Sequence, residues 1–322
     1  MNLNEAMTMP GLLSLDILSD LEKKVLWLAA QTIHNANHER GDASGVKVGG
    51  HQASCASITT IMTALYFSVL RPQDRIAVKP HASPVFLAIQ YLFGNQTLEK
   101  LKDFRALKGA QSYPSRTKDV DDVDFSTGSV GLGVAMTAFA SMAQEYIHAR
   151  DWATDWPKGR MIALAGDAEL DEGNIYEALI EGWKHGLKNT WWIIDYNRQS
   201  LDAVIKSPLT PKLTATFENM GWQVVTLKFG KKLQEIRTQP GGQAILDRIE
   251  ACDNALYSAL TFQGAAGWRT QLNQDLKQHP QALELIHNLA DDALTTLMTN
   301  LGGHCMETLL EAFNAIDTEQ PV

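Results

Sequence analysis

Two apolar runs constrain the fold of this chain more than any other feature. They are "RMIALAG" (160–166) and "TWWIIDY" (190–196), and the segment 172–186 between them is predicted to be helical. Near-continuous apolar runs are typical of central strands that are covered on both faces. Strands that alternate with helices at this spacing predict an α/β fold, a parallel sheet with helices on both faces.

The rest of the chain extends this alternation. We predict further strands at 75–80 and 222–228, a polar surface loop at 108–127 and a mostly helical segment at 230–300. Pro84 can begin the helix "SPVFLAIQYLFG", because a proline in the first helical turn loses no hydrogen bond. Other helices are predicted at 14–38, 57–70, 97–107 and 211–220, and after a glycine-rich turn within 128–150.

Composition excludes several classes of function. The chain has 322 residues and a formal net charge of −9, whereas nucleic acid and anionic membranes attract basic surfaces. Cys55, Cys252 and Cys305 lie far apart in the sequence, so neither a disulfide framework nor a zinc site is expected. No signal-peptide pattern or membrane span is found in the sequence, and we expect a cytoplasmic protein with no membrane or nucleic-acid partner.

Polar residues follow three of the predicted strands. His81 follows the first, Asp167 follows the second, and Asp195, Asn197 and Gln199 lie at or just past the end of the third. In open parallel sheets, ligands bind at the carboxyl ends of the strands. A carboxylate, an amide oxygen and a backbone carbonyl are hard oxygen ligands, which magnesium and calcium prefer. The sequence therefore predicts a divalent metal site shared by Asp167 and Asn197.

The glycine-rich stretch "TGSVGLG" precedes a predicted helix and offers backbone N–H groups to an anion at the same edge. Together with the metal site, it favours a bound diphosphate. Each feature also has a purely structural interpretation: the glycines can allow close helix packing, Asp167 can be a helix N-cap, and Glu169, Asp171 and Glu172 can complement a helix dipole. Their joint occurrence favours the functional interpretation.

Several stretches occur in the order found in the transketolase superfamily: "GGHQAS", "KPHASPVFLAIQYLFG", "FRALKGAQSYPSR", "STGSVGLG" and "GDAELDE". The stretch that begins at Gly166 and ends at Asn197 resembles the thiamine-diphosphate motif, which begins Gly-Asp-Gly and ends in Asn about thirty residues later. The chain most resembles the homodimeric decarboxylating component of bacterial pyruvate dehydrogenase, over roughly 35–230 and again at "LGGHCMETLLEAF".

The resemblance implies thiamine diphosphate and magnesium as cofactors. Asp167 and Asn197, with the backbone carbonyl of Gln199, would hold magnesium on the diphosphate. Ala168 and Glu169 would line the diphosphate side of the cleft. Such a cofactor stabilises a carbanion, and the protein orients it and excludes water.

The resemblance also implies roles for residues from other stretches. His81 would hydrogen-bond the diphosphate, and His51 would face the substrate, where a histidine can move protons. Glu172 and Glu177 match acidic residues that lie in a hydrogen-bonded path between the two active sites of a dimer. The other residues expected beside the cofactor or the substrate are Ser54, Tyr113, Gly128 and Val130.

The sequence departs from the family pattern at three places. Ala168 stands where the motif has glycine, and Lys79-Pro80 stands where the pyruvate enzymes carry Gln-Gly. Arg116 and Lys118 add positive charge that suits a second carboxylate or a phosphate. The sequence therefore leaves the substrate open between pyruvate, 2-oxoglutarate and a ketose phosphate.

The superfamily builds each active site from two domains, and this chain resembles the first of them. We predict an N-terminal helical arm at 1–40 and a diphosphate-binding α/β domain at 41–322, with a mostly helical excursion at about 230–300. The last strand of the domain is expected after Val322. We therefore expect a fragment of a longer polypeptide or one subunit of a split enzyme, inactive without a second, pyrimidine-binding domain or subunit.

Three functions follow from these observations. The leading one is a homodimeric 2-oxo-acid dehydrogenase that decarboxylates pyruvate and serves a lipoyl-bearing acyltransferase. The second is a transketolase acting on sugar phosphates, against which "QSYPSR" argues because that family has a histidine-containing loop there. The third is a non-catalytic subunit of a split enzyme, against which the intact Asp167 and Asn197 pair and both histidines argue.

Overall fold

The computed structural model describes residues 13–40, 45–152, 154–197, 210–316 and 319–322. At its centre, three strands form a parallel sheet in the order β1 (Arg75–Ala77), β2 (Met161–Gly166) and β3 (Thr190–Asp195). Gly166 pairs with Asp195, so β2 and β3 end level with one another at one edge of the sheet. The predicted parallel α/β fold is confirmed, although β1 is shorter than the predicted 75–80.

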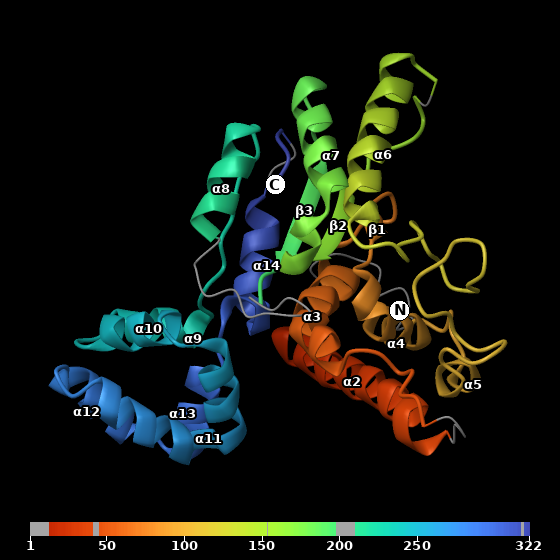
Figure 1. Ribbon diagram of the computed structural model, residues 1–322. Coiled ribbons are helices and arrows are strands. Elements are labelled where there is room, and N and C mark those ends of the chain that lie inside the picture. The colour runs from red at the N-terminus through yellow and green to blue at the C-terminus, as the bar shows by residue number, and fades with distance from the viewer. Residues whose placement is uncertain (1–12, 41–44, 153, 198–209, 317–318) are drawn as a thin grey trace.

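Helices surround this sheet (Figure 1). No helix in the described part of the chain is both long and apolar enough to cross a membrane. Two π-helical turns extend α2 over Asn35–Glu39 and α3 over Leu65–Val69, and short 3-10 turns cover Pro80–Ala82, Asp167–Asp171 and Gly302–His304. The α-helices are α2 (Leu15–His34), α3 (Gln52–Ala64), α4 (Ser83–Leu92), α5 (Leu98–Lys102), α6 (Leu132–Ala149), α7 (Gly173–Lys184), α8 (Thr210–Asn219), α9 (Lys231–Arg237), α10 (Gly242–Glu250), α11 (Asn254–Asp275), α12 (Pro280–Asn288), α13 (Asp291–Met298) and α14 (Met306–Ala315).

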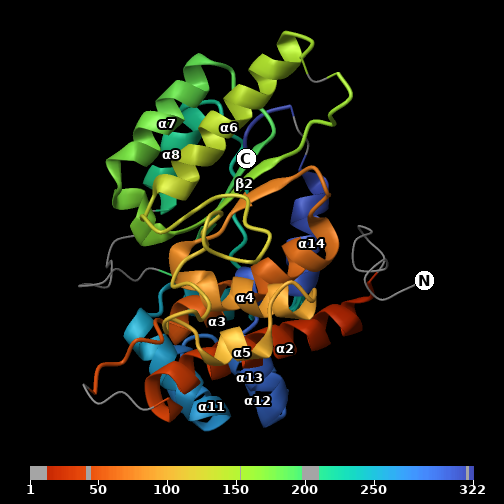
Figure 2. The same ribbon diagram turned by 90° about the vertical axis from the view of Figure 1, so that its right-hand side faces the viewer.

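The two faces of the sheet enter two different hydrophobic cores. Successive strand residues point to opposite faces. Ile162 and Leu164 pack with residues of α2, α3, α4 and α14, whereas Ala163 and Trp192 pack with residues of α6, α7 and α8. Figure 2 shows α6, α7 and α8 beside β2 at one end of the molecule and α2, α3 and α4 below it. Cover on both faces explains why the strand sequences are apolar without alternation.

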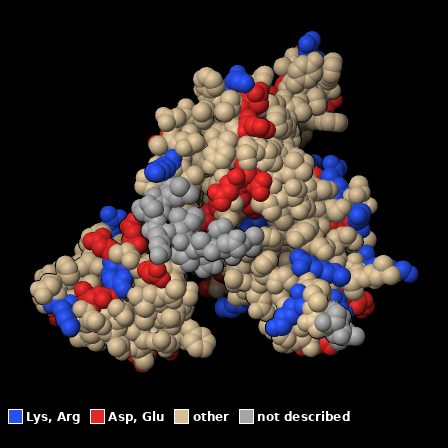
Figure 3. All heavy atoms as spheres, viewed as in Figure 1, with Lys and Arg blue, Asp and Glu red and all other residues tan. Residues whose placement is uncertain are grey.

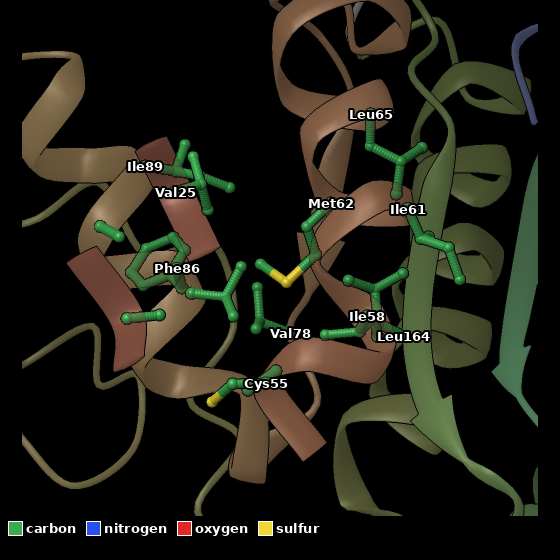
Figure 4. Packing of buried hydrophobic residues seen from close by; sticks show 14 of the residues in the cluster. Val25, Cys55, Ile58, Ile61, Met62, Leu65, Val78, Phe86, Ile89 and Leu164 are labelled. Atoms are coloured by element: carbon green, nitrogen blue, oxygen red, sulfur yellow. The ribbon is translucent and has the colours of Figure 1, made fainter. Parts of the chain in front are cut away.

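The larger core lies between α3 and the elements around it. In Figure 4, Met62 and Ile58 of α3 lie between Val25 of α2, Phe86 of α4 and Leu164 of β2. Full burial of one such side chain contributes roughly 1.5–3 kcal/mol to stability. This core fixes the first turn of α3 against the end of β1, which is where the candidate site begins.

The segment that follows α8 is mostly helical, as the sequence pattern indicated, and its helices form a hydrophobic core of their own. Helices α9 to α13 lie together, away from α2 to α4 (Figure 1), and their buried side chains include Leu233, Trp268 and Ile286. An isolated β-bridge between Phe229 and Leu301 closes the segment at its base. The division of the chain into an arm and domains stays a prediction.

The predicted strand at 222–228 is wrong, because no ladder forms there among the described residues. Val322 instead lies along the free edge of β3: its carbonyl accepts a bond from Trp192 N at 2.8 Å, and its N–H donates to Thr190 O at 3.0 Å. Gln223 N donates to Pro321 O at 2.9 Å. Residues from the far end of the chain thus lie between β3 and the segment that the local pattern favoured as a strand.

Two other boundaries differ from the sequence prediction. Helix α3 begins at Gln52, five residues before the predicted start, and α4 begins with Pro84 in its first turn as expected. The helix predicted at 97–107 ends at Lys102, since Arg105 and Lys108 adopt positive φ angles of 63° and 67°. The loop at 108–127 has no helix or strand, but parts of it are buried rather than on the surface.

Candidate functional site

The candidate site lies at the carboxyl edge of the sheet. Lys79 follows β1, Gly166 ends β2 and Asp195 ends β3. The first turn of α3 and the 3-10 turn after β2 approach the same edge. The topology therefore brings together residues that are more than a hundred positions apart in the sequence.

A buried ion pair closes one side of this edge. The Lys79 Nζ atom lies 2.9 Å from Asp195 Oδ2, and Ser57 Oγ donates to the same carboxylate at 2.6 Å. The side chains of Lys79 and Asp195 are only 5% and 8% exposed. Asp195 is therefore held by α3 and by the end of β1. Apart from a lysine at the end of an apolar strand, no local pattern in the sequence pointed to this network.

Two of the predicted site histidines lie together. The ring centroids of His51 and His81 are 4.7 Å apart, and His81 lies 6.4 Å from the ring of Tyr113. A Cβ atom on Gly128 would lie 3.7 Å from the Tyr113 ring, so the glycine-rich stretch reaches the same cluster. His51 stands at the N-terminus of α3 and is exposed, whereas His81 is half-buried.

The environment of His81 favours a neutral imidazole. Burial lowers the pKa of His81 from 6.5, and the positive charges of His51, Lys79 and Arg105 lower it further. Arg105 lies over the Tyr113 ring at 5.6 Å and donates from Nη1 to Val48 O at 2.7 Å. The sequence did not point to Arg105, whose contribution depends on a turn with positive φ after α5.

Glu169 clamps two glycine backbones at the edge of the sheet. Its Oε1 accepts from Gly166 N at 3.0 Å and its Oε2 accepts from Gly131 N at 3.0 Å. Burial raises the pKa of the Glu169 carboxyl, and the two N–H donors and Lys79 oppose that rise. The predicted diphosphate-side residue is thus engaged with the backbone, and it joins the glycine-rich stretch to the end of β2.

Gly131 is required by geometry at this joint. Its φ is +77°, a conformation that L side chains rarely adopt. A Cβ atom there would lie 2.8 Å from Glu172 Cβ and 2.8 Å from Asn174 Oδ1. Glu172, the exposed N-cap residue of α7, therefore packs directly against the glycine-rich stretch.

Asp167 and Asn197 follow the paired ends of β2 and β3. Asp167 is 3% exposed, and its Oδ1 accepts from Ala168 N at 3.1 Å. The carbonyl of Asn197 accepts from Asn254 Nδ2 at 2.7 Å, so the first residue of α11 anchors this loop. Gln199 lies outside the described residues. Within the described ranges, no three His, Cys, Asp or Glu side chains group to hold a metal. The predicted magnesium site would use one carboxylate and one amide, and so would not form a group of this kind.

The other predicted residues lie around this edge without a recorded polar contact to it. Ser54 is half-buried in the first turn of α3, Val130 is half-buried in the glycine-rich stretch, and Glu177 is exposed on α7. Arg116 and Lys118 are exposed in the 108–127 loop. Figure 3 shows acidic and basic side chains interspersed over one face, with no continuous basic patch on it.

Comparison with known proteins agrees with this geometry. Residues 49–244 match the family model described as "Transketolase, thiamine diphosphate binding domain". The pyruvate dehydrogenase E1 component of Cupriavidus necator is 25% identical over 311 residues, which cover 93% of this chain and 33% of that protein. The corresponding protein of Escherichia coli K12 is 26% identical over 316 residues, covering 94% and 34%. The chain spans about a third of the length of these curated relatives.

Solved structures of transketolases share the fold. The transketolase of Campylobacter jejuni is 26% identical and has a TM-score of 0.55 over 66% of this chain and 33% of its own. The transketolase of Leishmania mexicana is 20% identical with a TM-score of 0.56, over 66% of this chain and 32% of its own, and shows likeness of fold alone. Because the family model matches more than half of the sequence and contains both histidines and the β2 and β3 edge, this chain belongs to the family of transketolase thiamine-diphosphate-binding domains.

Proposed function

We propose that this chain is the diphosphate- and magnesium-binding part of a thiamine-diphosphate-dependent 2-oxo-acid dehydrogenase of the pyruvate type. The observation that carries the proposal is the convergence of His81, Asp167 and Glu169 at one edge of the sheet. Similarity to pyruvate dehydrogenase E1 components over 93–94% of this chain supports a 2-oxo acid as the substrate.

The residues present fit the proposed cofactor and metal. Asp167 offers a carboxylate and Asn197 an amide oxygen, the donor set that magnesium prefers, and Gln199 would add its carbonyl. A neutral His81 places an N–H group at the same edge of the sheet, where it would donate to a diphosphate. Gly131 and Gly166 leave open backbone where a side chain would crowd Glu172 or Lys79.

Thiamine diphosphate, when bound, supplies the carbon centre that stabilises the negative charge left by decarboxylation. The chain's own residues orient it and manage protons. A neutral His81 can donate one hydrogen bond and accept another at the diphosphate side. His51, exposed at the start of α3, can move a proton to or from a substrate oxygen. The cleft around the cofactor would be lined by Ser54, Tyr113, Gly128, Val130 and Ala168.

The proposal extends to partners. A homodimer is implied, in which Glu172 and Glu177 of α7 would join a hydrogen-bonded path between two sites. A second, pyrimidine-binding domain or subunit would complete each site, and a lipoyl-bearing acyltransferase would accept the product in the cytoplasm. The chain alone is expected to be inactive.

A second candidate is a transketolase acting on sugar phosphates. Solved structures of transketolases resemble this fold, and the exposed Arg116 and Lys118 could meet a substrate phosphate. The absence of a histidine in "QSYPSR" argues against this reading, and we place it second.

Two measurements test the proposal. The holoenzyme, completed by its pyrimidine-binding part, is assayed with pyruvate, 2-oxoglutarate and a ketose phosphate, and turnover of pyruvate is expected to dominate. Asp167→Ala should weaken magnesium-dependent binding of thiamine diphosphate by more than about 100-fold in calorimetry, with the fold intact. The matched control is Asp171→Ala, an exposed carboxylate in the same 3-10 turn. Equal affinity in both variants would contradict the proposed metal site.

A further inference from the structure

Lys79 is a lysine whose ammonium group lies inside the protein. Its side chain is 5% exposed, and its hydrogen-bonded partner Asp195 is 8% exposed. Lysine is almost never buried unless its charge is paired, so a specific environment must hold it there. None of the roles proposed above accounts for a cation at this position, where the sequence also departs from the pattern of the family.

The position of the ammonium is well defined by its neighbours. Lys79 stands two residues past the end of β1, and its Nζ reaches the carboxylate of Asp195 at the end of β3. A Cβ atom on Gly166 would lie 3.4 Å from Cε and 3.4 Å from Nζ of Lys79. The lysine therefore crosses the carboxyl end of β2, beside the residue that directly precedes Asp167. This is the edge at which the diphosphate is proposed to bind.

In this ion pair the carboxylate has two hydrogen-bond donors, whereas the ammonium has one acceptor among the described residues. Asp195 accepts from both Ser57 and Lys79. The ammonium has three protons, and Asp195 is its only recorded acceptor among the described residues. Two N–H donors of a buried cation thus lack a protein partner there, and a buried donor without an acceptor is costly. Their position at the carboxyl edge of the sheet suits an anionic acceptor there.

We propose that Lys79 is a diphosphate-binding residue, which donates from its ammonium to a phosphoryl oxygen of the cofactor. The proposal rests on the proposed function of this edge. Lys79 adds a fixed cation to this edge of the sheet. The acidic residues there, Asp167, Glu169 and Asp195, would otherwise repel a diphosphate. Lysine serves phosphates as a point charge elsewhere, and the pairing with Asp195 holds this one in place.

The competing explanation is that Lys79 only neutralises Asp195. A variant that removes both charges separates the two explanations, since it leaves neither partner buried and unpaired. In Lys79→Gln/Asp195→Asn, two amides replace the ion pair at similar volume. The matched control is Glu181→Gln/Lys184→Gln, which neutralises an exposed ion pair on α7.

Binding is measured by calorimetry on the protein completed by its pyrimidine-binding part, with magnesium present. The probes are inorganic pyrophosphate, thiamine diphosphate and thiamine without phosphate. The double variant should bind both phosphorylated probes about 10- to 100-fold more weakly than wild type, the equivalent of one charge-assisted hydrogen bond, and thiamine equally well. Unchanged affinity of a folded double variant for pyrophosphate would overturn the proposal.

Asp195→Asn alone gives a second, independent measurement if the double variant fails to fold. It frees the ammonium from its carboxylate and keeps the bond from Ser57 Oγ. The proposal then expects pyrophosphate to bind several-fold more tightly, because the cation no longer shares its charge. A purely structural ion pair would give equal or weaker binding, which would contradict the proposal.

The wild-type protein separates this inference from the proposed function. If wild type binds neither thiamine diphosphate nor pyrophosphate in the presence of magnesium, the proposed function itself fails. If wild type binds both and the double variant binds them equally, only the role of Lys79 fails.

Discussion

The imidazole rings of His51 and His81 lie with their centroids 4.7 Å apart and their planes inclined by 56°. Two imidazoles at this distance repel one another when both are in the positively charged imidazolium form. Burial is the main cause of the lowered pKa of His81, and the charge of His51 adds to it. The pair therefore places an exposed histidine, His51, beside a half-buried histidine, His81, whose environment favours the neutral form.

We predict that His81 is neutral at pH 7 and titrates below 6.5. His51→Gln should raise the pKa of His81, since it removes a nearby positive charge. Histidine NMR signals followed between pH 5 and 8 measure both effects, and the acidic limb of the pH profile of cofactor binding should move with them. His279→Gln, at an exposed position between α11 and α12, is the control. A pKa of His81 at or above 6.5 contradicts the prediction.

Glu169 is predicted to stabilise the fold through its two backbone hydrogen bonds. In Glu169→Gln, one carboxylate oxygen becomes an amide nitrogen that faces the N–H of Gly131 or Gly166. The lost bond and the donor-donor contact should lower the free energy of unfolding by about 1–3 kcal/mol in urea denaturation. Glu235→Gln, at an exposed position on α9, should change it by less than about 0.5 kcal/mol. Equal effects of the two substitutions would show that the hydrogen bonds from Gly131 and Gly166 to Glu169 add no stability.

The opposite edge of the sheet depends on another buried ion pair. The guanidinium of Arg160 is bonded to the carboxylate of Asp74 and lies 4.4 Å from the ring centroid of Trp191. Asp74 Oδ1 also accepts from Arg160 N at 2.8 Å, and Oδ2 accepts from Arg71 N at 2.8 Å. The side chains are 7% and 2% exposed, so neither charge can turn to water.

Asp74→Ala should therefore lower the free energy of unfolding by about 3–5 kcal/mol, because it leaves the Arg160 charge buried and unpaired. The double variant Asp74→Leu/Arg160→Met should cost less than Asp74→Ala alone. Asp20→Ala breaks an exposed pair with Lys23 and should cost less than about 1 kcal/mol. Additive effects of Asp74 and Arg160 substitutions in denaturant titrations would contradict a coupled pair.

The sheet and its edge were predictable from the sequence because their signals are local. The runs 160–166 and 190–196 are apolar throughout since both faces are covered, and Asp167 and Asn197 follow them directly. The order of motifs also identified the two histidines, which the fold brings together. Local pattern, motif order and the parallel connection were sufficient for these features.

The features that the sequence did not predict depend on contacts between distant residues. "WQVVTLK" has the composition of a strand, yet Pro321 and Val322 occupy the place beside β3. The ion pair of Lys79 joins residues 116 positions apart, and that of Arg160 joins residues 86 positions apart. Arg105 reaches the histidine cluster only through a turn with positive φ. Contacts between residues so far apart cannot be predicted from the hydrophobic periodicity of a single sequence.

We predict that the free energy of unfolding depends on pH through the buried carboxyl group of Asp121. Its Oδ2 accepts from Gln96 Nε2 at 2.9 Å, and its Oδ1 is buried without a partner among the described residues. Burial, with the charge of Asp119, raises the pKa of Asp121 from 3.8 to about 6. A raised pKa in the folded state means that folding favours the protonated form. The stabilisation is therefore complete below about pH 4 and is lost as the pH rises through about 6.

Asp121→Asn should remove this dependence, because the amide cannot ionise. At pH 7.5 the variant should be more stable than wild type by about 1 kcal/mol, a value reduced from the full pKa shift to allow for solvent screening. The difference should shrink as the pH falls through 6 and vanish near pH 4. Urea titrations between pH 4 and 7.5 measure it, with the exposed Asp103→Asn as control. A constant difference across that range would show that the buried carboxyl does not titrate there, and that the loop at 108–127 accommodates the charge.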